Sequence, residues 1–363
     1  MSNVDVVIPC YNYARYLDQC VQSILSQRDV NVRILIVDDQ SSDDTPAACA
    51  RLAASDPRVS FKRNEKNLGL IGTANVGIMG WASAEYYSLI SADDALVPGS
   101  LARSTQVLNA HPEAGLVMGP ALIIDDTTQI MPPTDPRAAT YQVISGDAYL
   151  RRNFEAGNPA PSPSVVLRTK MQHKLGGYHP AMRHTSDMEM WMRFALHGPI
   201  ALIRDVQSLY RWHGANMTLG FDLIRDREER LKTCDVVYEA GGEKNPRFME
   251  MFGNMKRYFA HEAYWFAGEA MERGDSVEMK RCLAFAETCD PNIRNRPIAW
   301  RFKVKQLLGP SLSKGMRGAM NEAKRALGGE ERAWFAPNSE LGWYPDAKEL
   351  GEAPLAEGVA ETA

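Results

Sequence analysis

Val4-Asp-Val-Val-Ile-Pro9 and Val32-Arg-Ile-Leu-Ile-Val37 are short runs rich in β-branched residues, separated by a segment with apolar residues at helical spacing. Buried runs that alternate with helices are typical of βαβ units, whose strands lie parallel in one sheet. The alternation continues through the first 120 residues and predicts a doubly wound α/β domain with a mainly parallel central sheet. The expected strands span residues 4–9, 32–37, 59–64, 86–91, 115–124, 164–168, 200–205 and 209–212, and the expected helices span 13–27, 74–82, 101–109 and 187–197.

The composition is that of an ordinary globular protein. The 363 residues leave room for two domains, or for one large domain with an appendage. A formal net charge of -4 gives no strong attraction to polyanions, so nucleic acid is not an expected partner. The 6 cysteines lack metal-ligand spacing and predict reduced thiols. The N-terminus has no signal-peptide pattern and no run of about 18 apolar residues occurs, so we expect a cytoplasmic protein.

The sequence changes beyond residue 220, where helical patterns predominate and an all-helical C-terminal region is expected. Residues 255–273 and 276–289, joined by Gly274-Asp275, predict an antiparallel pair of helices. The stretch 294–325 is rich in Lys and Arg, with Glu322 its only acid. It predicts either a solvated helical face packed on the first domain or a peripheral contact with the anionic inner face of a membrane. The expected divisions are a first domain over 1–220, a helical region over 221–327 and a disordered acidic tail over 328–363.

Polar residues follow three of the expected strands. They are Pro9-Cys-Tyr-Asn12, Asp38-Asp39 and Asp93-Asp94. In an open α/β sheet the ligand lies outside the carboxyl ends of the strands, where these segments would converge. Because neighbouring carboxylates repel one another, their convergence indicates a shared cation or hydrogen-bond donors on a ligand.

The order of these motifs resembles that of family 2 glycosyltransferases of GT-A fold. The segments that carry the resemblance are Val6-Val-Ile-Pro-Cys-Tyr-Asn12, Ile36-Val-Asp-Asp-Gln-Ser-Ser-Asp43, Asn67-Leu-Gly69 followed by Asn75, Ser91-Ala-Asp-Asp94, Asp187-Met-Glu-Met-Trp-Met-Arg193 and Tyr210-Arg-Trp-His213. Five or six motifs in the family's order, over roughly residues 1–218, are a specific signal. The helical C-terminal region lies outside the resemblance.

The resemblance implies a nucleotide-sugar donor site in the first half of the chain. Tyr11 would lie against the nucleobase, and Asp39 would accept a hydrogen bond from it. Asp38 would either bond the ribose or brace its loop. Pro9, Asn12 and Asn67 belong to the same implied donor site.

The resemblance also implies a divalent metal. Asp94 would bind Mn²⁺ or Mg²⁺, which stabilises a departing nucleoside diphosphate, and Asp93 would face the ribose and sugar. Arg211 would approach the diphosphate. His213 would be a second metal ligand, with a satisfied surface histidine as the alternative. One departure from the family pattern is Thr73-Ala74, which stands where an Arg before Asn75 is usual.

Asp187 matches the position of the family's general base. It would remove the proton of an acceptor hydroxyl that attacks the anomeric carbon, and the product would have inverted stereochemistry. The alternative is an acid that only favours the start of its helix. Glu189 is the second candidate for the base. Ser186 stands where most relatives carry an additional acid.

The expected function is therefore an inverting, metal-dependent glycosyltransferase. It would move a sugar from a nucleotide sugar, most simply a UDP-sugar, to a saccharide or lipid-linked saccharide, in cell-surface polysaccharide synthesis. One alternative is a sugar nucleotidyltransferase, although Pro9-Cys-Tyr-Asn12 is not the Gly-rich basic loop expected after its first strand. The other is an inactive binding or scaffold protein on the same fold.

Overall fold

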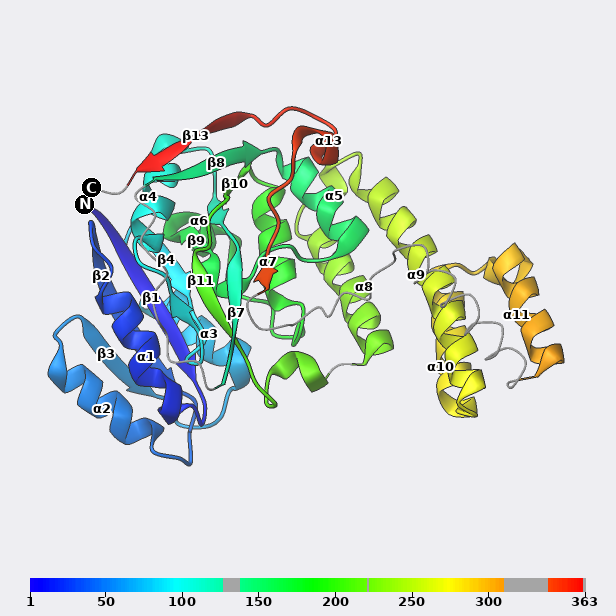
Figure 1. Cartoon of the computed structure of the whole chain (residues 1–363), viewed down its shortest axis with the longest axis horizontal. Helices are drawn as coiled ribbons and strands as arrows, with labels where there is room; N and C mark the ends of the chain where they lie inside the picture. The colour runs from blue at the N-terminus through cyan, green and yellow to red at the C-terminus, as the bar shows by residue number, and fades with distance from the viewer. Residues whose placement is uncertain (127–137, 221, 310–338, 362–363) are drawn as a thin grey trace.

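The computed structural model describes residues 1–126, 138–220, 222–309 and 339–361. A nine-stranded sheet forms the body of the molecule, with strand order β13-β8-β10-β6-β9-β4-β1-β2-β3. A second sheet has the order β12-β7-β11-β5. Figure 1 shows that α9, α10 and α11 extend away from this body as a helical arm.

The N-terminal half of the large sheet is parallel, as its apolar runs predicted. Its strands are β1 (Ser2–Cys10), β2 (Val30–Asp38), β3 (Val59–Arg63) and β4 (Tyr86–Leu89). Val4, Val6 and Ile8 pack with α1 and α2 on one face, while Val7 packs with α3 on the other. The helices between these strands are α1 (Ala14–Leu25), α2 (Thr45–Ser55) and α3 (Gly69–Gly80). Burial on both faces explains why these strands read as continuous apolar runs.

The other half of the large sheet is mixed. β9 (Val166–Arg168) lies antiparallel between β4 and β6 (Leu116–Met118). Beyond β6, β10 (Ile200–Ile203) is parallel to β6 and antiparallel to β8 (Ala138–Ile144). The large sheet is thus mixed, with continuous parallel pairing over β4-β1-β2-β3 and one further parallel pair, β6 with β10.

The single strand expected over 115–124 is wrong. The chain forms β6 in the large sheet and β7 (Ala121–Asp125) in the small sheet, with Gly119-Pro120 between them. Proline has no backbone N–H to donate to a sheet, so it favours a break at this point. β7 pairs with β11 (Ser208–Trp212), which also pairs with β5 (Ala95–Leu96).

The longer helices that follow β5 in the chain either pack around the mixed part of the large sheet or form the arm. They are α4 (Ser100–Ala110), α5 (Gly146–Ala156), α6 (Thr169–Leu175), α7 (Ser186–Ala195), α8 (Leu223–Glu239), α9 (Phe248–Glu272), α10 (Ser276–Cys289) and α11 (Pro297–Leu308). The expected helix pair is present as α9 and α10, where the Asp275 side chain caps α10 by accepting from the N–H of Glu278. No helix in the described part of the chain is long and apolar enough to span a membrane.

The expected disordered tail over 328–363 is wrong for residues 339–361, whereas α8 to α11 confirm the helical region before it. β12 (Glu340–Leu341) pairs with β7, and β13 (Ala356–Glu361) pairs with β8 at the edge of the large sheet. The short helix α13 (Ala347–Leu350) lies between them. An exposed sheet edge offers unpaired backbone groups, and β13 satisfies those of β8. The remainder of the expected tail, and residues 310–325 of the basic stretch, lie outside the described residues.

Candidate active site

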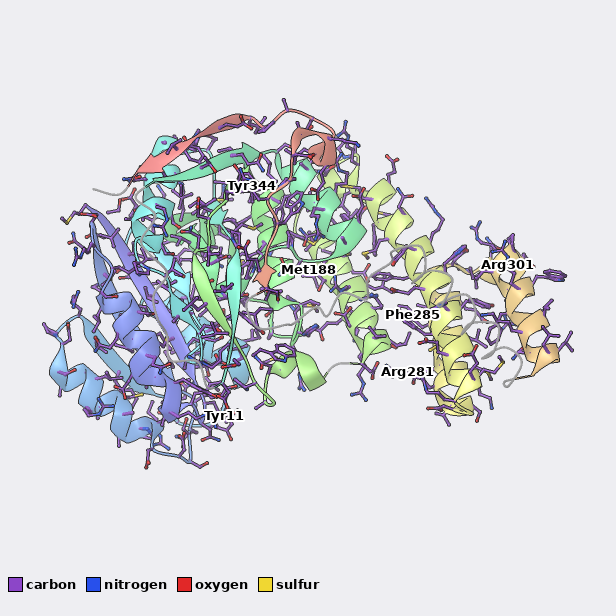
Figure 2. All side chains as sticks on the ribbon, viewed as in Figure 1. Tyr11, Met188, Arg281, Phe285, Arg301 and Tyr344 are labelled. Carbon is purple, nitrogen blue, oxygen red and sulfur yellow. The ribbon has the colours of Figure 1, made fainter. Side chains whose placement is uncertain are left out.

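A cavity of about 1190 Å³ lies at the carboxyl ends of β1, β2 and β4. One wall comes from the N-terminal half of the chain and includes Pro9, Tyr11 and Asp39. A second part of the lining comes from the segments 158–163 and 183–188, and it includes Met188, which Figure 2 labels together with Tyr11. A further part of the lining is Ser339–Gly342, from the C-terminal segment. The topology therefore joins three distant parts of the sequence in one site.

Asp39 lies in this cavity at the start of α3. Its Oδ1 accepts hydrogen bonds from the Leu68 N–H (2.7 Å) and from Asn64 Nδ2 (2.9 Å), and its Oδ2 accepts from the Gly69 N–H (2.8 Å). Asn67 also lines the cavity, and its Nδ2 donates to the Asp39 carbonyl (3.0 Å). A carboxylate at a helix N-terminus is favoured electrostatically, so this contact positions the Asp39 loop.

Asp38 and Asn12 brace the loops below Tyr11. The buried Asp38 does not line the cavity: its Oδ1 accepts from the Ser41 N–H (3.0 Å), and its Oδ2 lies 3.3 Å from Arg63 Nε. Asn12 has a positive φ of 58°, and its Oδ1 accepts from the Ser42 N–H (2.8 Å). Both residues thus connect backbone segments, and for Asp38 the geometry favours the bracing alternative. Tyr11 is 50% exposed and is available to a flat ligand.

Asp93 and Asp94 lie side by side after β4 and are both buried. Asp94 Oδ1 accepts from the Arg211 N–H (2.9 Å), while Asp93 Oδ2 accepts from His213 Nε2 (3.0 Å). Asp93 Oδ1 is buried and has no hydrogen-bond partner within the described ranges. Burial, together with the charge of Asp93, raises the pKa of Asp94 well above its ordinary value. The ionised form of Asp94 is therefore disfavoured unless a further positive charge joins the pair.

Arg211 and His213 support this pair from outside the cavity lining. The Arg211 guanidinium donates to the carbonyls of Asp93 and Asp125 (both 3.0 Å) and to Gln19 Oε1 (2.8 Å). The His213 ring accepts from the Ala215 N–H at Nδ1 (3.1 Å), so Nε2 carries the proton given to Asp93. Both ring nitrogens are thus engaged. Within the described ranges no group of three or more His, Cys, Asp or Glu side chains is arranged to hold a metal.

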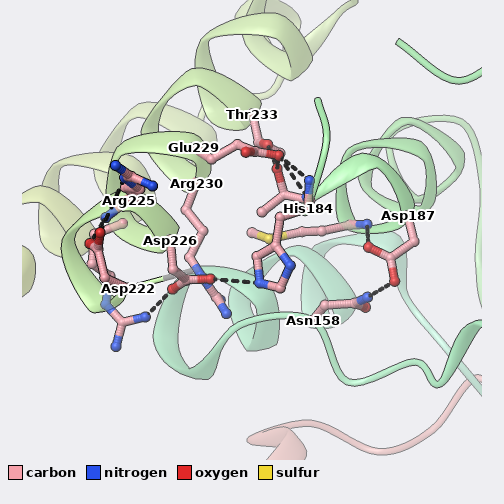
Figure 3. Close-up of polar contacts among 12 residues, drawn as sticks. Asn158, His184, Asp187, Asp222, Arg225, Asp226, Glu229, Arg230 and Thr233 are labelled. Carbon is pink, nitrogen blue, oxygen red and sulfur yellow. Dashed lines mark hydrogen bonds and ion pairs between the residues drawn. The ribbon is translucent and has the colours of Figure 1, made fainter. Parts of the chain in front are cut away.

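Asp187 lines the same cavity and lies in the first turn of α7 (Figure 3). Its Oδ2 accepts from Asn158 Nδ2 and from Ser162 Oγ (both 2.9 Å), and its Oδ1 accepts from the Met188 N–H (2.7 Å). Burial raises the pKa of Asp187, while the hydrogen bond from Ser162 acts in the opposite direction. A carboxylate with a raised pKa that lines a cavity is suited to accept a proton.

Glu189, the second candidate for the base, does not line the cavity. It is fully buried, and its Oε1 lies 2.5 Å from Arg193 Nε within the same helix. This ion pair fixes Glu189 away from any acceptor, so the geometry favours Asp187.

The chain also matches known proteins in sequence. Residues 5–172 match the model of the family described as Glycosyl transferase family 2. These residues form a glycosyltransferase family 2 domain. It is 27% identical over 248 residues to an uncharacterized glycosyltransferase of Haemophilus influenzae, covering 65% of this chain and 73% of that relative. An uncharacterized glycosyltransferase of Rickettsia felis is 24% identical over 245 residues, which are 65% of this chain but only 38% of that protein.

Solved structures confirm the GT-A-type fold of this family 2 glycosyltransferase. S. aureus TarS 1-349 in complex with UDP-GlcNAc has a TM-score of 0.59 at 14% identity, covering 97% of this chain and 98% of that one. The mannosyltransferase PcManGT from Pyrobaculum calidifontis, in complex with GDP-Man and Mn²⁺, has a TM-score of 0.51 at 16% identity, covering 84% and 79%. At these identities the likeness concerns the fold.

The structure adds residues that the sequence did not single out. Asn158 and Ser162 hold Asp187, and they lie in the stretch 158–162 between α5 and β9, which carries none of the motifs. Arg152, Arg183 and Arg230 line the same cavity. No motif marks these arginines, because they come from separate elements that only the fold brings together.

Proposed function

We propose that this family 2 glycosyltransferase moves a sugar from a nucleotide sugar to a hydroxyl group of a saccharide or lipid-linked saccharide, with inversion. One observation carries the proposal: a single cavity is lined by Asp93, Asp94 and Asp187. The first pair suits a diphosphate with its metal, and the last suits an attacking hydroxyl. Because TarS, a protein of similar fold, is known with UDP-GlcNAc, a UDP-sugar is the first donor to test.

The donor would occupy the wall formed by the N-terminal half. The half-exposed ring of Tyr11 offers a face for a planar base. Asp39 Oδ2 accepts one hydrogen bond from Gly69 and retains acceptor capacity for an N–H of the base. Pro9 and Asn67 line the same wall, while Asn12 ties the Tyr11 loop to Ser42. These contacts support a preformed nucleoside site.

The residues present fit a divalent cation. Asp93 Oδ1 is buried without a partner among the described residues, and burial with the adjacent charge raises the pKa of Asp94. A cation would relieve both conditions, with Asp93 and Asp94 as its oxygen ligands. Mn²⁺ or Mg²⁺ bound here would stabilise negative charge on the departing diphosphate. Arg211 and His213 hold the two aspartates in place, the former through its N–H to Asp94 and the latter through Nε2 to Asp93.

Asp187 would act on the acceptor. Its carboxylate takes the proton of the acceptor hydroxyl while that oxygen bonds to the anomeric carbon and the bond to the nucleotide breaks. Attack from the face opposite the leaving group inverts the configuration in one displacement. Asn158 and Ser162 both donate to Oδ2, which fixes the orientation of the carboxylate. Their bonds also stabilise the ionised form that a base requires.

The donor site can be tested by the thermal stability of the purified protein with UDP, GDP, dTDP or CDP, each with Mn²⁺, Mg²⁺ or EDTA. A ligand at about 100 times its Kd adds roughly 2.7 kcal/mol, which raises the melting temperature measurably. Stabilisation by one nucleotide that needs metal and is lost in Asp94→Asn is the expected result. An absence of any nucleotide effect would contradict the proposal and favour the scaffold alternative.

The described part of the basic stretch supports peripheral membrane contact. Trp300 is 69% exposed and Leu307 is 88% exposed on α11. Figure 2 shows that Arg301 projects from this helix at the far end of the arm. Exposed apolar side chains beside cations suit an anionic lipid surface. Binding to liposomes with and without anionic lipid, at low and high salt, tests this in the wild type and in a Trp300→Ala/Arg301→Ala variant. Equal binding by both proteins would contradict it.

A further inference from the structure

Three arginines surround the part of the cavity that contains Asp187. Arg152 is on α5, Arg183 is in the loop before α7, and Arg230 is on α8. All three line the cavity, as does His184. Positive groups from three elements therefore line the same cavity as the proposed base.

Contacts between these groups show how close they lie. Arg152 Nη1 donates to the Gly157 carbonyl (2.9 Å). The Arg230 guanidinium packs against the same glycine and leaves no room there for a Cβ. Asn158, the next residue, donates to Asp187 Oδ2. The guanidinium groups of Arg152 and Arg230 thus contact Gly157, and the next residue, Asn158, makes the hydrogen bond that orients the proposed base.

The nearby carboxylates are already engaged. Asp226 forms ion pairs with Arg227, Arg230 (2.8 Å) and His184 (3.2 Å), and Figure 3 shows Arg230 running beside Asp226. Glu229 Oε1 accepts from the N–H groups of His184 and Thr185.

The three arginines differ in how far their charges are matched. Burial lowers the pKa of Arg152 and the charge of Arg230 acts in the same direction, while the carboxylates of Glu349 and Glu155 raise it. Arg183 is exposed and has no hydrogen bond or ion pair with another described residue. Because Arg230 shares Asp226 with Arg227 and His184, and Arg183 pairs with no described carboxylate, the charges of these guanidinium groups are only partly matched, which favours an anion between them.

We propose that Arg152, Arg183 and Arg230 form a subsite for an oxyanion carried by the acceptor, a phosphate or a carboxylate group. Guanidinium groups bind such planar or tetrahedral oxyanions through paired N–H donors. The subsite would hold the acceptor with its hydroxyl beside Asp187. The inference rests on the proposed glycosyl transfer, because it names the class of acceptor for that reaction.

The test compares binding of charged and neutral probes to the full chain. The probes are glycerol phosphate against glycerol and glucuronate against glucose, titrated by calorimetry at constant ionic strength with UDP and Mn²⁺ present. The variants are Arg183→Gln and Arg152→Gln. Arg51→Gln is the matched control, because Arg51 pairs with Asp18 on the outer surface of α2. UDP affinity and the melting temperature are measured for each protein.

At least one charged probe should bind about tenfold more tightly than its neutral match, and either cavity variant should remove most of that preference. The control and the affinity for UDP should be unchanged. A preference for glycerol phosphate identifies a phosphate-bearing acceptor, and one for glucuronate identifies an acidic sugar. Equal binding of charged and neutral probes overturns the inference. So does a loss of UDP affinity in the cavity variants, which would assign the arginines to the donor diphosphate. Failure of the wild type to bind UDP counts instead against the proposed function.

Discussion

Replacing Asp187 with Asn separates catalysis from stability at this position. The substitution keeps the size of the side chain but removes the charge and one of the two acceptor oxygens. Asp187 accepts from Asn158, Ser162 and the Met188 N–H, so Asn leaves at least one of these donors without its bond. If the carboxylate is the general base, kcat should fall by about 10²-fold to 10⁴-fold.

The expected effect on stability has the opposite sign to that of an ordinary helix-start acid. Burial raises the pKa of Asp187, so folding disfavours its ionised form. Such a group contributes stability below its unfolded pKa, and this contribution is lost as the pH rises through the folded value. At pH 7 the charge therefore destabilises the fold. Asn removes that cost while losing a hydrogen bond of roughly 1 kcal/mol, so the melting temperature should be unchanged or slightly higher.

The assay measures sugar transfer and thermal unfolding on the same preparations. A variant that loses activity, keeps its melting temperature and still binds the nucleotide confirms the reasoning. A helix-start role alone predicts the reverse, which is normal kcat with a loss of about 0.5–2 kcal/mol of stability. That reverse result would refute the assignment of Asp187 as the base.

Further outcomes follow from other contacts of the site. Glu189→Gln should lower the free energy of unfolding by roughly 3 kcal/mol, because it leaves the buried Arg193 without its carboxylate partner. The kcat of the folded enzyme should be unchanged, and urea unfolding with a rate assay checks both outcomes. Asp39→Asn should weaken UDP binding and destabilise the start of α3 by about 1–3 kcal/mol, and calorimetry that finds full affinity contradicts it. Gly342→Val should weaken the pairing of β12, because Gly342 has φ +137° and a Cβ there would lie 2.8 Å from Pro120 Cα. Amide hydrogen exchange in β12 that is no faster than in the wild type would contradict this. The rate of transfer should decline on acidification at a pH above the ordinary range of an aspartate, since burial raises the pKa of Asp187, and a pH–rate profile of kcat measures this.

Much of the first domain could be predicted from the sequence, because patterns of neighbouring residues mark its strands and the polar segments that follow them. β1 and β2 are buried on both faces, so their continuous apolar runs identify them. The short acidic segments Asp38-Asp39 and Asp93-Asp94 follow such strands, and parallel strands place their carboxyl ends at one edge. The break between β6 and β7 was missed, because the residues before and after Gly119-Pro120 are equally apolar, although they belong to two different sheets.

The sequence by itself determined the α/β class, the motif order and the residues at the carboxyl ends of the strands, since these depend on short-range periodicity and spacing. Only the tertiary structure decided which of these side chains face the cavity. It turned Asp38, Arg211 and His213 into supports, because Asp38 pairs with Arg63 and the hydrogen bonds of Arg211 and His213 reach Gln19 and Asp93. It also brought three arginines into the cavity that Asp187 lines, and it paired the C-terminal strands β12 and β13 with the two sheets. Such contacts form because neighbouring elements must satisfy buried polar groups and open sheet edges, and no local pattern encodes the partner.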